Sequence, residues 1–305
     1  MLKKNQFKNM VYFFVVPIII GSILSCLLIC YFVHKSTSRQ IFPARRIEEH
    51  LLFRDILRNR FFAQPVSFKT DDNVSLAGLL IVRPGASRSI LLCHGYRMAK
   101  ERMHRFALMF PQDNILFFDY RAHGESGGKW TTIGYHEKKD VHAACNFLNE
   151  HEHTKNIPIV GIGVSMGAVS LLAAATECSL FKAVILDSPF CRLDEQTKRM
   201  VVHRHKMPYV PFGLLVQNFF ERMHQFQLNS VNSVEWAQKL RVPVLMIHSH
   251  YDKTVPVNDA YRIYEQINAK KELWVVSKSG HARIFTEIPN EYAQRIDQFL
   301  SDVKI

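Results

Sequence analysis

One serine lies between two glycines, directly after an apolar run, in the stretch VGIGVSMGAVS that covers residues 160–170. A serine hydroxyl is a poor nucleophile at neutral pH unless a histidine removes its proton, and a carboxylate normally orients that histidine. Ser165 is therefore either a nucleophile on a tight strand-to-helix turn or a small residue in a glycine-rich connection. The motif alone does not decide, so the rest of the chain must supply a base and an acid.

Candidate partners follow later apolar segments of the chain. VPVLMIHS is followed by HYDKTVP, which places Asp252 just beyond a predicted strand, and LWVVSK is followed by SGHARIF, which places His281 beyond the next. The chain order Ser165, Asp252, His281 is that of hydrolases with a nucleophile elbow. Asp187, which ends the preceding predicted strand in VILDSP, is the alternative acid. The sequence therefore predicts a Ser-His-Asp triad.

The remaining histidines and cysteines give weaker signals. We expect His94 in CHGY to shape the loop after its strand, and His123 to stabilise its turn, rather than to act as bases. Three alternating histidine pairs lack a third ligand in any local motif, so we expect no metal site: His151/His153, His203/His205 and His248/His250. The six cysteines show no C-x-x-C spacing and are expected to be free, mostly buried thiols. No cofactor is expected.

The elements that must position these residues alternate along the chain. PVSFKTDDNVSLAGLLIV predicts two strands joined by a turn at residues 71–73. Six short apolar runs follow, separated by helical stretches: SILLC, NILFFDY, IPIVGIG, AVILDSP, VPVLMIHS and LWVVSK. Such runs fit strands buried on both faces. The alternation predicts an α/β domain, a mostly parallel, doubly wound sheet with helices on both faces and the chemistry at the carboxyl ends of the strands.

Several motifs together resemble the α/β-hydrolase superfamily over about residues 65–303. LLCHGYRMAK, FFDYRAHGESGG, GIGVSMGA, LDSPF, HSHYDKTVP and SGHAR occur in the expected order, and the chain is similar to serine hydrolases of the Bem46 and ABHD12/13/17 type, which are membrane-anchored or lipid-facing. The resemblance implies that Ser165 attacks an acyl carbon, His281 transfers its proton and Asp252 orients the imidazole. It also implies an oxyanion hole made by the backbone N–H groups of Tyr96 and Met166.

The N-terminal part predicts a membrane anchor. Residues 10–33 are 24 residues without a charge, which exceeds the ~20 needed to cross a bilayer as a helix. A cleaved signal peptide, or a lipoprotein site at Cys26, is the alternative. The predicted organisation is a basic tail (1–9), a transmembrane anchor (10–33), a basic and helical connector (34–63) and a hydrolase domain (64–305). Basic residues flank both sides of the span, so the side that holds the domain stays open.

Residues 190–232 interrupt the alternation without an obvious strand. They carry many large apolar side chains: Met200, Met207, Phe212, Leu214, Leu215, Phe219, Phe220, Met223 and Phe226. We interpret this insertion as a lid over an apolar pocket. The alternative is that these side chains only pack the insertion onto the domain.

These features predict a single-pass, membrane-anchored serine hydrolase that cleaves ester or thioester bonds. The expected substrate is a small molecule or lipid with an acyl chain, such as a lysophospholipid or monoacylglycerol, or an acylated protein. A peptidase or amidase of the prolyl-peptidase type and a non-catalytic, membrane-tethered binding module are the alternatives. The net charge of +12 favours anionic surfaces, but no nucleic-acid-binding motif accompanies it, so no nucleic-acid partner is expected.

Overall fold

The structure is a computed structural model that describes residues 44–204, 206, 208–277 and 279–305. It also describes single positions nearer the N-terminus: Val16, Ile18, Ile20, Gly21, Leu24, Ser25, Leu27, Leu28, Tyr31, His34 and Ser38. These residues form two compact units. One contains residues 38–196 and 229–305, and the other contains residues 197–228 with the described positions before residue 38.

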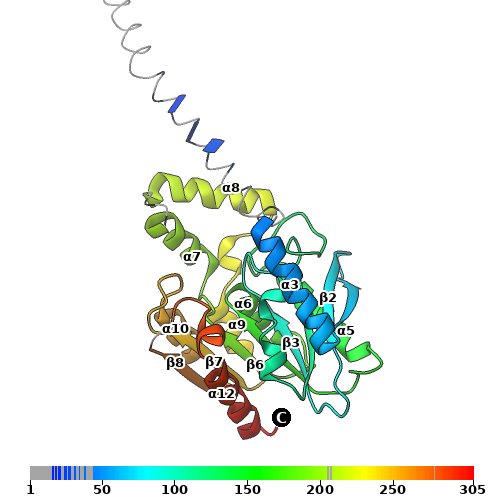
Figure 1. The fold of residues 1–305 in the computed structure, drawn as a ribbon. Helices are drawn as coiled ribbons and strands as arrows, with labels where there is room; N and C mark the ends of the chain where they lie inside the picture. Colours follow the sequence, from blue (N-terminus) through cyan, green and yellow to red (C-terminus); the bar gives the residue numbers. More distant parts are fainter. Residues whose placement is uncertain are drawn as a thin grey trace, which may run out of the picture. The chain divides into compact units, whose positions relative to one another are not determined.

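A sheet of eight strands runs through the first unit (Figure 1). The strands are β1 (Gln64–Lys69), β2 (Ser75–Ile81), β3 (Ser89–Cys93), β4 (Asn114–Phe118), β5 (Ile159–Val164), β6 (Phe181–Asp187), β7 (Val244–Ser249) and β8 (Lys271–Val276). Their order is β1-β2-β4-β3-β5-β6-β7-β8. Strands β3 to β8 are parallel, whereas β2 pairs antiparallel with both β1 and β4. The structure confirms all eight predicted strands.

Ten helices accompany the strands in the described residues. They are α3 (Ala44–Phe61), α4 (Phe106–Met109), α5 (Glu137–Glu150), α6 (Met166–Ala175), α7 (Leu193–Arg199), α8 (Leu214–His224), α9 (Ser233–Lys239), α10 (Val257–Gln266), α11 (Ile284–Glu287) and α12 (Pro289–Asp302). Short 3₁₀ turns lie at Lys100–Met103 and Leu228–Ser230, and π-helical turns lie at Met200–Arg204 and Tyr209–Gly213.

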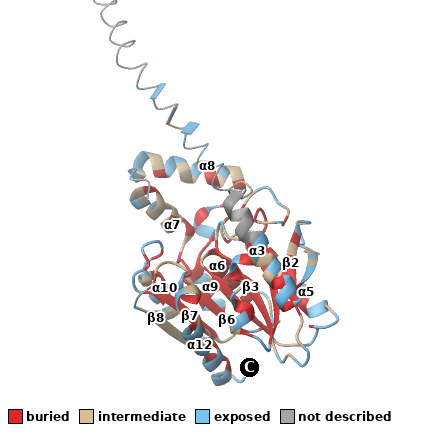
Figure 2. Ribbon diagram, viewed as in Figure 1, coloured by how far each residue is buried: buried red, intermediate tan, exposed pale blue. Residues whose placement is uncertain are grey.

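The core has two apolar layers, one on each face of the sheet. Along β3, Leu91 and Cys93 belong to the layer that contains side chains of α5, α6, α9 and α10. Ile90 and Leu92 belong to the layer that contains side chains of α3, α4, α11 and α12. Successive strand residues point to opposite faces, so an unbroken apolar run is what a sheet covered on both sides requires. Figure 2 shows this continuous buried interior.

Helix α3 lies within the segment predicted as a connector, residues 34–63. Its Leu57 is fully buried and its Phe61 nearly so, and both belong to the second apolar layer. Of the two predicted locations for this segment, a membrane surface or the body of the domain, the packing of these side chains supports the second.

Residues 197–228 lie inside the predicted insertion and have a hydrogen-bonded framework of their own. The Tyr209 hydroxyl donates to Gln217 Oε1 (2.7 Å), and Gln217 Nε2 donates to Glu221 Oε1 (3.0 Å). Several apolar side chains here remain exposed, including those of Val210 and Leu214. The function of a lid stays a prediction.

The prediction of a single-pass membrane protein is wrong. Among the described residues, no helix combines the length and the apolarity needed to cross a bilayer. Most of the predicted span, residues 10–33, lies outside the described residues, as does the basic tail that precedes it.

Candidate active site

Ser165 occupies a sharp turn between β5 and α6. Strand β5 ends at Val164 and α6 begins at Met166, so Ser165 alone makes the change of direction, with φ +55° and ψ −117°. A residue with a side chain adopts such a positive φ only at a cost of about 1–3 kcal/mol, which the surrounding structure must offset. The turn leaves the Ser165 side chain half-buried at the carboxyl end of the sheet.

Two glycines make this turn possible by close packing. A Cβ on Gly163 would lie 2.6 Å from the carbonyl oxygen of Gly167. A Cβ on Gly167 would lie 2.6 Å from the carbonyl oxygen of His94 and would overlap the carbonyl of Cys93. The first turn of α6 therefore rests directly on the backbone that follows β3, which brings Ser165 next to that loop.

Replacing Gly167 by alanine should destabilise the protein by about 1–3 kcal/mol, because the neighbours that must move are backbone atoms. Chemical denaturation measures this loss. Gly280→Ala is the matched control, since the Cβ added there meets only the flexible side chain of Arg283, at 3.3 Å. Equal midpoints for the two variants would contradict the packing argument.

The structure brings Ser165, His281 and Asp252 into one hydrogen-bonded chain. Ser165 Oγ lies 2.9 Å from His281 Nε2, and His281 Nδ1 lies 2.6 Å from Asp252 Oδ2. These residues follow β5, β8 and β7, which end at the same edge of the sheet. The His281 side chain is 21% exposed and that of Asp252 is fully buried. The imidazole of His281 is therefore accessible from solvent, whereas the carboxylate of Asp252 is not.

The Asp252 carboxylate is held in its ionised form. Burial alone would raise its pKa, but His281 and the two backbone N–H groups of Thr254 and Val255 outweigh burial and hold the pKa below its usual value. These N–H groups donate to Oδ1 from 2.8 and 2.9 Å. An ionised carboxylate fixes the tautomer of His281 and leaves Nε2 free to accept the serine proton.

Two further residues support this carboxylate and the histidine, and the sequence did not indicate either role. His248 Nε2 lies 3.6 Å from Asp252 Oδ2 and bonds to the carbonyl of Val255 at 2.9 Å. Burial lowers the pKa of His248. The Ser249 hydroxyl donates to the carbonyl of Ser279, which ties the end of β7 to the loop that carries His281. Their positions at the end of β7 were visible in the sequence, but their partners were not.

Asp187, the alternative acid, has a different environment. It ends β6 and is fully buried. Its Oδ1 accepts a hydrogen bond from the Ser188 hydroxyl at 2.8 Å. Burial raises the pKa of Asp187 to about 6. Of the two candidate acids, Asp252 therefore holds the hydrogen bond to Nδ1 of His281.

The loop predicted to carry the oxyanion hole lies beside the nucleophile. A Cβ built on Gly95 would lie 3.6 Å from the Cβ of Ser165, and Tyr96 follows directly. Met166 is the first residue of α6, and the first N–H groups of a helix lack carbonyl partners within it and favour negative charge. Both predicted donors, Tyr96 and Met166, thus lie close to Ser165.

Two neutral histidines brace this loop. His94 Nδ1 lies 2.8 Å from the Gly95 carbonyl, and its Nε2 accepts the backbone N–H of Tyr120 at 3.1 Å. His123 Nε2 accepts the backbone N–H of Arg97 at 3.2 Å. Burial lowers the pKa of His94 to about 3 and also lowers that of His123. His94 supports the loop after β3, as the sequence predicted, and His123 supports its own turn through Nδ1, which lies 2.9 Å from the Arg121 carbonyl.

A buried lysine, Lys100, forms ion pairs at the end of the same loop. Lys100 Nζ lies 2.7 Å from Asp119 Oδ2, 3.0 Å from Glu101 Oε1 and 2.6 Å from Glu125 Oε2. Asp119 Oδ1 also accepts the backbone N–H of Lys100 at 2.8 Å. Lys100 is 1% exposed. A charge this deeply buried is retained only with such partners.

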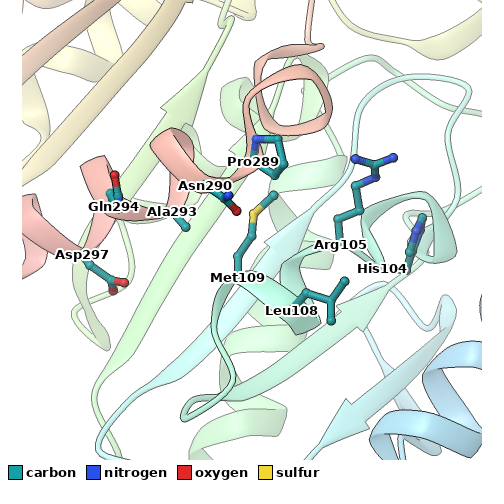
Figure 3. A pocket seen from close by; sticks show the side chains of 9 residues that line it. All are labelled: His104, Arg105, Leu108, Met109, Pro289, Asn290, Ala293, Gln294 and Asp297. Atoms are coloured by element: carbon teal, nitrogen blue, oxygen red, sulfur yellow. The ribbon is translucent and has the colours of Figure 1, made fainter.

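A surface depression lies elsewhere on the same unit. It is lined by His104 and Arg105, which follow the first 3₁₀ turn, by Leu108 and Met109 of α4, and by residues of α12 (Figure 3). None of Ser165, Asp252 and His281 lines it. It is therefore separate from the candidate active site.

Comparisons with known proteins find similar sequences and structures. The family model described as serine aminopeptidase, S33, matches residues 85–225. The uncharacterised protein YqkD of Bacillus subtilis (strain 168) is 28% identical over 94% of this chain and 93% of its own. Human alpha/beta hydrolase domain-containing protein 17C is 27% identical over 73% of this chain and 62% of its own.

Solved structures are similar as well. The Pyrococcus furiosus esterase Pf2001 is 27% identical, with a TM-score of 0.68 over 81% of this chain and 95% of its own. The Pyrococcus horikoshii acylaminoacyl peptidase is 18% identical, with a TM-score of 0.60 over 79% of this chain and 41% of its own. At that identity, the second likeness concerns the fold alone.

Proposed function

Because this chain belongs to the α/β-hydrolase superfamily, as its ABHD17-type relatives and structural neighbours show, we propose that it is a serine hydrolase that cleaves carboxylic ester or thioester bonds through an acyl-enzyme. The observation that carries the proposal is the hydrogen-bonded chain from Ser165 Oγ through His281 to Asp252, with links of 2.9 and 2.6 Å.

The proposed mechanism assigns one step to each group. His281 Nε2 takes the proton of Ser165 as Oγ attacks the acyl carbon, and Asp252 stabilises the imidazolium that forms. The backbone N–H groups of Tyr96 and Met166 bind the oxyanion, where one such donor contributes about 10²–10³ in turnover. His281 then protonates the leaving alcohol or thiol. Water, deprotonated by the same nitrogen, releases the acid and restores Ser165.

Ester cleavage and amide cleavage are the two reactions to separate. Esterase Pf2001 resembles this chain at 27% identity, and this supports esters. The matching family model is described as a serine aminopeptidase, and this favours amides as the alternative. An apolar acyl chain is the proposed substrate part.

A matched pair of substrates tests the reaction. We expect p-nitrophenyl acyl esters and acyl thioesters to be turned over, with a burst of product equal to the enzyme concentration for activated esters, whose acylation is faster than deacylation. We expect p-nitroanilides of the same acyl groups to give a much lower kcat/KM. A kcat/KM for the anilides equal to or above that for the esters would make the protein an amidase. A panel of acyl chain lengths then tests the apolar substrate part.

A further inference from the structure

Two cysteines outside the candidate active site lie side by side. Cys145 is a buried residue of α5, and Cys178 is a partly exposed residue three positions beyond the end of α6. Their sulfur atoms are 3.5 Å apart. Both are free thiols. A disulfide needs a sulfur separation of about 2.0 Å, so an approach of the order of 1.5 Å would join them.

Charged and polar groups surround Cys178 on its exposed side. His142, one turn before Cys145 on α5, interacts with the Cys178 side chain, and its Nε2 lies 3.3 Å from Glu177 Oε2. Lys138 Nζ lies 2.8 Å from Glu177 Oε1. The His142 imidazole therefore lies next to the Cys178 thiol, and the Glu177 carboxylate lies next to that imidazole.

These contacts favour the thiolate at Cys178 and the thiol at Cys145. Interactions with the side chains of Cys145 and His142 and with the Leu180 backbone outweigh burial and lower the pKa of Cys178 to about 4. The neighbouring Cys178 and burial raise the pKa of Cys145. The hydrogen bond to Cys178 is also the main cause that raises the pKa of His142. Thiolates, not thiols, are nucleophiles, so the exposed partner is the reactive one.

We propose that Cys145 and Cys178 form a peroxide-sensitive dithiol, in which Cys178 attacks the peroxide and Cys145 resolves the product to a disulfide. First, the Cys178 thiolate attacks one oxygen of hydrogen peroxide. The S–O bond forms, the O–O bond breaks and hydroxide leaves, giving a sulfenic acid. Then Cys145 Sγ attacks Cys178 Sγ, the S–S bond forms, the S–O bond breaks and water leaves. Two electrons pass from the sulfurs to peroxide.

The other described cysteines provide internal references. Cys93 is fully buried, and burial raises its pKa to about 12. Cys191 is also fully buried, and its Sγ lies 3.2 Å from the Asp259 carbonyl. Buried thiols in such surroundings are inert. Oxidation at Cys178 can therefore be compared with two thiols of the same unit.

Peptide mapping of the full-length protein after hydrogen peroxide tests the proposal. We expect a Cys145–Cys178 disulfide that dithiothreitol reverses, with Cys93 and Cys191 still reduced. Cys145→Ser should instead yield a sulfenic acid on Cys178 that dimedone traps, and Cys178→Ser should leave Cys145 reduced. Cys191→Ser is the matched control and should form the disulfide as the wild type does.

A second measurement keeps the test independent of disulfide formation. Alkylation of Cys178 by iodoacetamide at pH 6 should be at least about tenfold slower in His142→Gln, because that variant loses the imidazole that helps to stabilise the thiolate. Equal rates in the two proteins, or oxidation of Cys178 no faster than that of Cys93, would overturn the proposal. Both measurements are repeated with Ser165→Ala, so their outcome does not depend on the proposed hydrolase activity.

Discussion

Replacing Ser165 by alanine should lower kcat/KM for acyl esters by about 10⁴–10⁶-fold while leaving the fold intact. The hydroxyl is the only nucleophilic atom that the hydrogen-bonded chain presents to an acyl carbon, and its loss also removes the 2.9 Å bond to His281. Steady-state turnover of p-nitrophenyl esters measures the effect, and labelling by a fluorophosphonate probe gives an independent readout at the same atom.

Ser170→Ala is the matched control for this variant. Ser170 lies in the same helix, α6, where its hydroxyl donates to the Met166 carbonyl at 2.8 Å and does not touch the triad. Its variant should keep turnover close to that of the wild type. His281→Ala should lose labelling together with turnover. Equal labelling of the wild type and His281→Ala would exclude the proposed triad, and no labelling of either would favour a non-catalytic binding protein.

Replacing Lys100 by methionine should lower the free energy of unfolding by about 3–5 kcal/mol at pH 7, the usual consequence of removing one partner of a buried ion pair. The methionine fills most of the volume, so the loss comes from charge. Asp119 is fully buried and Glu101 nearly so, and both would remain without their cation. The midpoint of urea denaturation measures the change.

The pH dependence identifies the cause of that loss. Burial would raise the pKa of Asp119, but Lys100 and its other partners hold it below the usual value. A depressed carboxyl pKa contributes stability above the pKa of the unfolded state, and that stability is lost as pH falls through the folded pKa. The difference between wild type and Lys100→Met should therefore be complete at pH 7 and narrow below about pH 4.

Lys138→Met is the control for Lys100→Met. The Lys138 and Glu177 side chains are 32% and 51% exposed, and an exposed pair of this kind contributes at most about 1 kcal/mol. A loss in Lys100→Met no larger than that of the control would contradict the account of the buried network. So would a pH-independent difference between Lys100→Met and the wild type.

The strands and the triad residues were predictable because local patterns encode them. An apolar run such as SILLC shows burial on both faces by itself, and the positions of Asp252 and His281 follow from where β7 and β8 end. The local sequence did not decide whether Asp252 or Asp187 is the acid. Both residues follow neighbouring strands, and only the folded loop shows which carboxylate meets Nδ1 of His281.

The supporting contacts were not predictable for the same reason. Lys100 and Asp119, and Ser249 and Ser279, lie far apart in the chain and meet only through sheet register and loop conformation. The prediction of a single-pass membrane protein rested on the length and lack of charge of residues 10–33 and was wrong, since no described helix meets the requirements for a span.

The order of the strands along the chain also has a consequence for synthesis on the ribosome. Ser165 follows β5, whereas His281 follows β8, more than a hundred residues nearer the C-terminus. The ribosome synthesises the chain from its N-terminus, at about 5–20 residues per second. A nascent chain therefore carries its serine without a base until β8 has paired with β7, and the proposed chemistry starts only after residue 281 has emerged from the ribosome.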